Sequence, residues 1–258
     1  MKKNFIVVKL IIFIFFLNSC ATKRDLLYLQ DANNNKIDTI HYQSNPIQCN
    51  DILSVTIGAS VPETSWVYNK QVLAFGGSTQ NNLEILKLQG YLVNIDGYIT
   101  LPILGNIHVV GKSINDLELE LINILEKQGH LMDPSVSVRI LNAKVTVLGE
   151  VKYPGTYSFT EQYITFPQAL GYAGDLTING KRNDLLLIRE INGERHIIHI
   201  DLTNSEWMKG GNYIIRSNDI IIVNPNTAKI KSAGYVGNAG TLVSVASVVL
   251  SSIILLTR

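Results

Sequence analysis

The stretch Asp133–Tyr157, DPSVSVRILNAKVTVLGEVKYPGTY, decides how the chain is organised. After the Asp-Pro turn signal, residues 135–140 alternate polar and apolar side chains, which is the period-2 pattern of a half-buried strand. Asn142-Ala143 interrupts that run, and a second apolar run begins at Val145. Pro154-Gly155 then predicts a tight reversal in which Gly155 has a positive φ. One β-rich unit therefore ends where the next begins, with almost no linker.

The unit before this point, residues 46–142, is predicted to be a small β-rich domain. Asp51–Ile57 alternates and is rich in β-branched residues, so it predicts a strand. Asp96-Gly97 lies between two alternating runs and predicts a two-residue hairpin turn with positive φ at both positions. Gly105-Asn106 predicts a second reversal. We assign no role to residues 58–90.

A helix is predicted to follow, from Ser113 to a stop at Gly129. Ser113 and Asp116 have the spacing of a capping box. One apolar stripe supports the helix, formed by Ile114, Leu117, Leu121, Ile124 and Leu125. Gly111-Lys112-Ser113 invites a phosphate-loop interpretation, but five residues separate Gly105 from Gly111 where that loop has four, so no nucleotide site is expected.

The unit after this point, residues 143–226, predicts a short helix, a hairpin and a last strand. Thr165 is the expected N-cap of the helix and Gly174 its end. Asn192-Gly193 predicts a hairpin between two apolar runs, and Asp219–Pro225 is the last predicted strand. This order of elements suits a β-grasp.

The residues offer no catalytic, cofactor or metal site. His196 and His199 are three apart on a predicted strand and would face opposite sides of the sheet. Four carboxylates could in principle form a sugar-hydrolysing pair, but their spacing singles out no two of them: Asp175, Asp184, Glu190 and Asp201. We therefore expect solvated carboxylates and a chain that is not an enzyme. A formal charge of +1 gives no electrostatic case for nucleic acid.

Residues 1–19 have the basic start and short apolar run of a secretory signal peptide. They end in Leu17-Asn18-Ser19-Cys20, which resembles the lipobox of bacterial lipoproteins. That resemblance implies lipidation at Cys20 and a lipidated tether over residues 20–45. The alternative is a plain signal peptide with an incidental cysteine. Cys49 is expected to be a small buried apolar side chain.

Residues 233–256 are predicted to form a transmembrane helix, since as a helix they would span roughly 35 Å. The hydroxyl residues project onto one half of the helix, so pore-lining positions are predicted at Thr241, Ser244, Ser247 and Ser251. Val248 and Leu255 interrupt that half. The alternative is a single lipid-bound anchor.

Three motifs resemble those of bacterial polysaccharide biosynthesis and export proteins, the Wza-like capsular polysaccharide export family. Tyr91–Gly111 is similar to the signature V-x-x-D-G-x-I-x-L-P-x-L-G-x-I-x-V-x-G, and Asp51–Ile57 is similar to its opening D-x-L-x-I strand. Val147–Val151, followed by Pro154–Tyr157, resembles the opening of the soluble-ligand-binding β-grasp (SLBB) module. The expected fold is α+β: a polysaccharide-export domain, one SLBB domain and a C-terminal transmembrane helix.

The resemblance implies an outer-membrane, lipid-anchored translocon subunit with most of the chain in the periplasm. Copies would form a homo-oligomeric ring, an octamer among the possible sizes, with an α-helical pore for capsular or extracellular polysaccharide. The implied partners are that polysaccharide, membrane lipid and an inner-membrane co-polymerase, often a tyrosine autokinase. Two alternatives stay open: a periplasmic glycan-binding lipoprotein that forms no pore, and a periplasmic carbohydrate-active enzyme.

Overall fold

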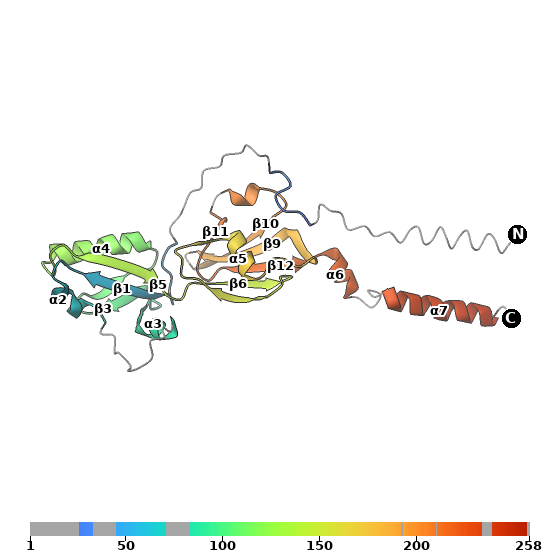
Figure 1. The fold of residues 1–258 in the computed structure, drawn as a ribbon, viewed down its shortest axis with the longest axis horizontal. Coiled ribbons are helices and arrows are strands. Elements are labelled where there is room, and N and C mark those ends of the chain that lie inside the picture. Colours follow the sequence, from blue (N-terminus) through green and yellow to red (C-terminus); the bar gives the residue numbers. More distant parts are fainter. Residues whose placement is uncertain are drawn as a thin grey trace.

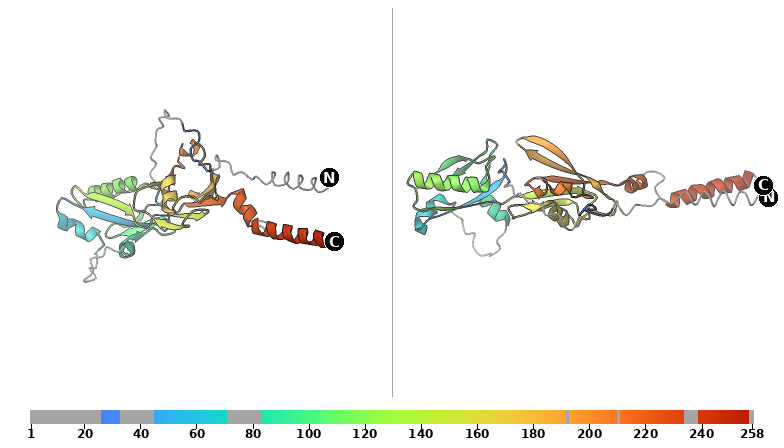
Figure 2. Two further views of the ribbon diagram at one scale, coloured as in Figure 1. Left: turned by 45° about the vertical axis from the view of Figure 1, so that its right-hand side comes forward. Right: turned by 90° about the horizontal axis from the view of Figure 1, so that it is seen from above.

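The computed structural model describes residues 26–32, 45–70, 83–191, 193–209, 211–233 and 239–256. Two β-sheets, each with a hydrophobic core of its own, follow one another along the long axis (Figure 1). Helices α6 (Thr227–Ser232) and α7 (Ala239–Leu256) come after the second sheet, and α7 extends away from it in each view (Figures 1 and 2). The mixed α and β content agrees with the predicted α+β class.

The first sheet has the order β2-β1-β5, formed by β2 (Tyr91–Leu92), β1 (Ile52–Gly58) and β5 (Ser135–Ile140). Strand β1 pairs antiparallel with both neighbours, and its register with β5 runs from Leu53 opposite Ile140 to Gly58 opposite Ser135. The two predicted strands are confirmed. Their alternating apolar side chains supply part of the first core because every second residue faces it.

Helix α4 (Ile114–Lys127) covers this sheet and begins and ends as predicted. Ser113 and Asp116 form the capping box, and Gly129 has a φ of +72° where the chain leaves the helix. The Glu118 carboxylate accepts a hydrogen bond of 2.8 Å from Val138 N and so covers part of the outer edge of β5. Lys112 forms an ion pair with Glu120, an arrangement unrelated to a phosphate loop.

The remaining elements of this half are short. They are α2 (Pro62–Ser65), the 3-10 turn η2 (Trp66–Tyr68), α3 (Leu83–Gln89), and the hairpin of β3 (Tyr98–Leu101) and β4 (Gly105–His108).

The turn at Asp96-Gly97 differs from the prediction. Only Gly97 has a positive φ, of +84°, and the turn is closed by bonds from Gly97 N to Asn94 O and from Asn94 N to Tyr98 O. This is a type I turn followed by a glycine bulge. The Asn94 side chain selects it, because its carbonyl oxygen accepts from the N–H groups of Asp96 and Tyr98 at 3.1 and 2.8 Å. The preceding strand β2 pairs with β1 instead of with β3.

The second reversal lies earlier than Gly105-Asn106. Gly105 already belongs to β4, and the chain turns at Pro102–Leu104, where Leu104 N donates to Pro102 O at 2.7 Å. Ile103 sits at the centre of this turn with a φ of +64°. A β-branched side chain is strained in that region of backbone conformation.

The second sheet has the order β10-β9-β12-β6-β7. Its strands are β6 (Lys144–Gly149), β7 (Gly155–Ser158), β9 (Gly180–Ile191), β10 (Glu194–Ile200) and β12 (Ile220–Pro225). Strand β12 runs parallel to β6 and antiparallel to β9, so the last strand lies at the centre of a mixed sheet. The predicted β9–β10 hairpin is confirmed. Gly155 does not have the positive φ that was expected; Gly149 does, at +88°.

Helix α5 (Phe166–Tyr172) packs on the second sheet and has the predicted N-cap. Thr165 accepts from Gln168 N, and the Gln168 side chain accepts in return from Thr165 N at 2.7 Å. Gly174 has a φ of +73° after the end of the helix. The small sheet of β8 (Ile164–Thr165) and β11 (Ile214–Ile215), and the 3-10 turn η3 (Glu206–Met208), complete this half.

Two terminal predictions differ from the structure. In the described parts of the chain, no helix is both long enough and apolar enough to cross a membrane, so the transmembrane helix predicted over residues 233–256 is not supported. Helix α6 ends at Ser232, and α7 begins six positions later than expected, at Ala239. Near the other terminus, residues 26–32 of the expected tether lie against the second sheet, where Leu29 packs on its core.

Candidate functional site

The two sheets are joined tightly where β5 runs into β6. Leu141 N donates to Ile52 O at 2.8 Å, and the Asn142 side chain bonds both Ile52 N and Asn50 O at 2.8 Å. Ile140 packs against the cores of both sheets. The hydrogen bonds fix residues 141–142 to the first half, and the packing of Ile140 against both cores is the contact that opposes hinge motion between the two halves.

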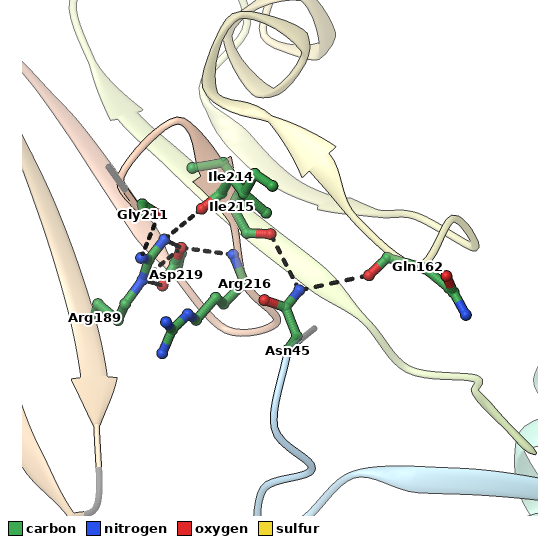
Figure 3. Close-up of polar contacts among 8 residues, drawn as sticks. All are labelled: Asn45, Gln162, Arg189, Gly211, Ile214, Ile215, Arg216 and Asp219. Carbon is green, nitrogen blue, oxygen red and sulfur yellow. Dashed lines mark hydrogen bonds and ion pairs between the residues drawn. The ribbon is translucent and has the colours of Figure 1, made fainter. Parts of the chain in front are cut away.

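A second crossing between the halves occurs at Asn45. Its amide nitrogen lies 3.4 Å from Ile215 O and 3.5 Å from Gln162 O, two long contacts with the second sheet's half (Figure 3). Two residues later, Ile47 is buried in the first core. Asn45 thus marks the point where the chain leaves the second half and enters the first.

A buried ion pair binds the loop that Asn45 contacts. Arg189, on β9, donates from Nε to Asp219 Oδ1 at 3.0 Å and from a terminal nitrogen to Asp219 Oδ2 at 2.6 Å (Figure 3). Asp219 immediately precedes β12. The two side chains are 3% and 1% exposed, so water competes for neither of them. Two-point geometry between a guanidinium and a carboxylate gives a strong, oriented contact.

The rest of this network binds the loop before β12. Arg189 also donates to Ile214 O at 2.8 Å and to Gly211 O at 3.3 Å, while Asp219 accepts from Arg216 N at 2.8 Å. We call the eight residues of Figure 3 the polar junction: Asn45, Gln162, Arg189, Gly211, Ile214, Ile215, Arg216 and Asp219.

Electrostatics at the polar junction follow from burial. Loss of water raises the pKa of the Asp219 carboxyl, and the hydrogen bonds and charge of Arg189 act in the opposite direction. Burial also lowers the pKa of the Arg216 guanidinium, to which the positive charge of Arg189 adds. The Asp219 charge is compensated inside the protein, so the junction is suited to holding two strands and a loop in place and not to proton transfer.

The predicted site residues lie apart from this junction. Cys20 is outside the described residues, as is the side chain of Thr241. Ser244, Ser247 and Ser251 are exposed on α7, and each hydroxyl donates to a carbonyl oxygen of its own helix at 2.8 Å. Their donors are therefore satisfied within the helix, so this face does not require water or a neighbouring chain for its hydrogen bonds.

The candidate carboxylates and histidines do not converge. His199 lies 2.8 Å from Asp184, which also pairs with Lys181, whereas Asp175 accepts from the Tyr28 hydroxyl. No group of three or more metal-ligating side chains forms among the described residues. Cys49 is half-buried instead of fully buried, with its sulfur 3.6 Å from Ile95 O.

The polar junction was not predicted, although one signal pointed to it. Within β9, Leu185, Leu187 and Arg189 share one face of the sheet because they are two residues apart. The first two are buried, so the arginine had to enter the same core and required an acidic partner. The sequence does not show which of the acidic residues supplies that partner.

Sequence comparisons match both halves. The profile of the family described as "Polysaccharide biosynthesis/export protein" matches residues 42–141, and the profile of the SLBB domain matches residues 144–198. Taken together, the two matches support a polysaccharide-export protein. Members of this family are transport components and not enzymes, which agrees with the prediction from the residues.

Two relatives carry the name "EPS I polysaccharide export outer membrane protein EpsA". The protein from Ralstonia solanacearum is 26% identical over 198 residues, which cover 74% of this chain and 51% of the relative. The protein from Ralstonia nicotianae is 30% identical over 154 residues, which cover 58% of this chain and 38% of the relative. The chain thus spans about half, or less, of the length of these relatives.

Proposed function

We propose that this protein is an outer-membrane transport component that exports capsular or extracellular polysaccharide from the periplasm to the cell surface. The observation that carries the proposal is the tandem match of an export profile and an SLBB profile along one chain. The names of the two relatives support both the substrate class and the membrane. The chain acts on its substrate by conducting it and not by breaking bonds.

The structural support for a ring is the rigidity of the connection between the halves. Copies in a closed ring must repeat one geometry, and a variable angle between the two sheets would prevent closure. The packing of Ile140 against both cores and the contacts of Asn45 with Ile215 O and Gln162 O restrict that angle. We propose a homo-oligomeric ring, of eight or another number of copies, that works with an inner-membrane co-polymerase.

We propose that Cys20 carries the lipid anchor at the membrane and that copies of α7 associate with one another around a channel in the ring. Thr241, Ser244, Ser247 and Ser251 would face its interior. The support is sequence spacing, which places these four positions on one side of the helix. Single cysteines at the serine positions should react with a membrane-impermeant thiol reagent, and cysteines at Val249 or Leu250 should not. Equal labelling at all positions would remove the channel assignment.

The export role is tested by deletion and complementation. A strain that lacks this protein should lose surface polysaccharide, and the wild-type gene should restore it; normal surface polysaccharide in the deletion strain would overturn the proposal. Particle images of the detergent-extracted protein test the ring. A monomer would favour the alternative of a glycan-binding lipoprotein without a pore.

A further inference from the structure

Residues 26–32, which we call the strap, add to the second sheet's half although they precede it by more than a hundred residues. Leu29 N donates to Leu202 O at 3.0 Å, and Gln30 N donates to Thr203 O at 2.7 Å. The Leu29 side chain packs on the core of the second sheet. In Figure 1 the strap is the short blue segment beside the loop that carries η3. Backbone pairing and apolar burial together fix its position.

Side chains hold the strap at both ends. The Tyr28 hydroxyl donates to Asp175 Oδ1 at 2.7 Å, and the Arg182 guanidinium lies 5.4 Å from the centre of the Tyr28 ring. At the other end, Ser205 Oγ donates to the Asp31 carboxylate at 2.8 Å. Burial and the bond to Asp175 raise the pKa of the Tyr28 hydroxyl, so it remains a donor at neutral pH.

The surface that receives the strap is held by contacts of its own. Asp175 has a φ of +69°, and its side chain also accepts from Leu176 N at 2.7 Å. Arg182 is buried and donates to Gly180 O at 3.0 Å, while its own carbonyl accepts from Leu202 N. The docking surface is therefore ordered by contacts that do not depend on the strap, which lowers the entropy cost of docking.

We propose that the strap docks to set the distance and orientation of the second sheet relative to the membrane. This rests on the proposed lipidation of Cys20. Eight residue steps separate Cys20 from Tyr28, which allows a reach of at most about 30 Å. A free tether up to Asn45 would have 25 steps and a reach of about 90 Å. Docking thus shortens the permitted distance between the lipid surface and the second sheet from about 90 Å to about 30 Å. It also turns the Asp175–Leu202 side toward the lipid surface.

The distance can be measured on the lipidated full-length protein in vesicles of phosphatidylethanolamine and phosphatidylglycerol. A donor dye on Asn183→Cys, in a Cys49→Ser background, transfers energy to an acceptor lipid. Leu29→Asp should release the strap and lower transfer by about twofold or more, because the permitted distance grows severalfold. Leu27→Asp is the matched control: it adds the same charge at a more exposed leucine and should leave transfer unchanged.

Hydrogen exchange reports the docking itself. The amides of Leu29 and Gln30 should be protected in the wild type and in Leu27→Asp, and should exchange freely in Leu29→Asp. Free exchange in the wild type would overturn the docking, and unchanged transfer after release of the strap would overturn its role as a spacer. A disulfide between Gln30→Cys and Thr203→Cys should form within one chain; a dimer on a gel would assign the strap to a neighbouring copy and overturn the proposal as stated. None of these measurements depends on polysaccharide export, so the deletion test can fail without affecting them.

Discussion

Each half of the molecule buries an aspartate, and the two differ in how many hydrogen-bond donors surround the buried carboxylate. Asp219 in the second half is 1% exposed and is surrounded by donors from Arg189 and Arg216. Asp51 in the first half is fully buried, accepts one bond from Gln48 N at 2.8 Å, and has a second oxygen without a hydrogen-bond partner. Burial raises the pKa of the Asp51 carboxyl to about 6. Burial raises the pKa of the Asp219 carboxyl as well, but there the hydrogen bonds and charge of Arg189 oppose the shift, whereas at Asp51 only the bond from Gln48 N opposes it.

The largest expected effect comes from breaking the compensated pair. Arg189→Met leaves the Asp219 charge buried without its counter-ion and should lower the free energy of unfolding by about 3 to 5 kcal/mol. Denaturant unfolding of the full chain measures this. Arg195→Met, at an exposed position on the neighbouring strand, is the control and should change stability by less than about 0.5 kcal/mol. Equal effects of the two variants would show that the pair does not hold this half together.

Close packing of β6 against β12 gives the next effect. Gly149 has a φ of +88°, and a β-carbon there would lie 2.1 Å from Val223 O on the central strand. Gly149→Ala should therefore cost about 2 to 4 kcal/mol, through backbone strain and separation of β6 from β12. Gly155→Ala is the matched control, because a β-carbon at Gly155 meets nothing nearer than 3.7 Å. Similar melting temperatures for the two variants would contradict this assignment.

The uncompensated aspartate predicts a pH dependence with a definite sign. The pKa of Asp51 is higher in the folded state than in the unfolded chain, so its stabilising contribution is complete below about pH 4 and is lost as pH rises through about 6. Relative to Asp51→Asn, the wild type should lose up to about 3 kcal/mol of unfolding free energy across this window. Asp96→Asn, at an exposed turn position, should follow the wild-type curve. Parallel curves for wild type and Asp51→Asn would refute the pKa shift.

The smallest expected effect comes from relieving backbone strain at Ile103 in the first half. Ile103 has a φ of +64°, a backbone conformation that is strained for a β-branched residue. Its side chain is 58% exposed, so burial offsets only part of that strain. Ile103→Gly should raise the free energy of unfolding by about 1 kcal/mol, since glycine adopts this conformation freely. Ile107→Gly, on the adjacent strand β4, should instead destabilise the protein. A thermal melt of both variants is sufficient, and a loss of stability in Ile103→Gly would show that its side chain contacts outweigh the strain.

Several elements of this protein were determined by sequence alone, because their causes lie within a few residues. Strands β1 and β5, helix α4 with its Ser113–Asp116 box, and α5 with its Thr165–Gln168 box depend on alternation, helical periodicity and caps. The predicted order of elements in the second half also agrees with the SLBB match at residues 144–198. Turn geometry was harder to predict from the sequence. The side chain of Asn94 stabilises the bulged turn at Gly97, and Ile103 has a backbone conformation that β-branched residues disfavour.

Only the tertiary structure decided the rest, because the partners are distant along the chain. Arg189 and Asp219 are 30 residues apart, and Tyr28 and Asp175 are 147 apart. Spacing in sequence cannot show which buried arginine meets which aspartate, since each could be satisfied by other acidic or basic residues. The positive φ at Gly149 likewise follows from the approach of Val223, which belongs to a strand formed much later in the chain. Local patterns set which segments are strands and helices, and long-range hydrogen bonds and burial set which of their polar groups meet.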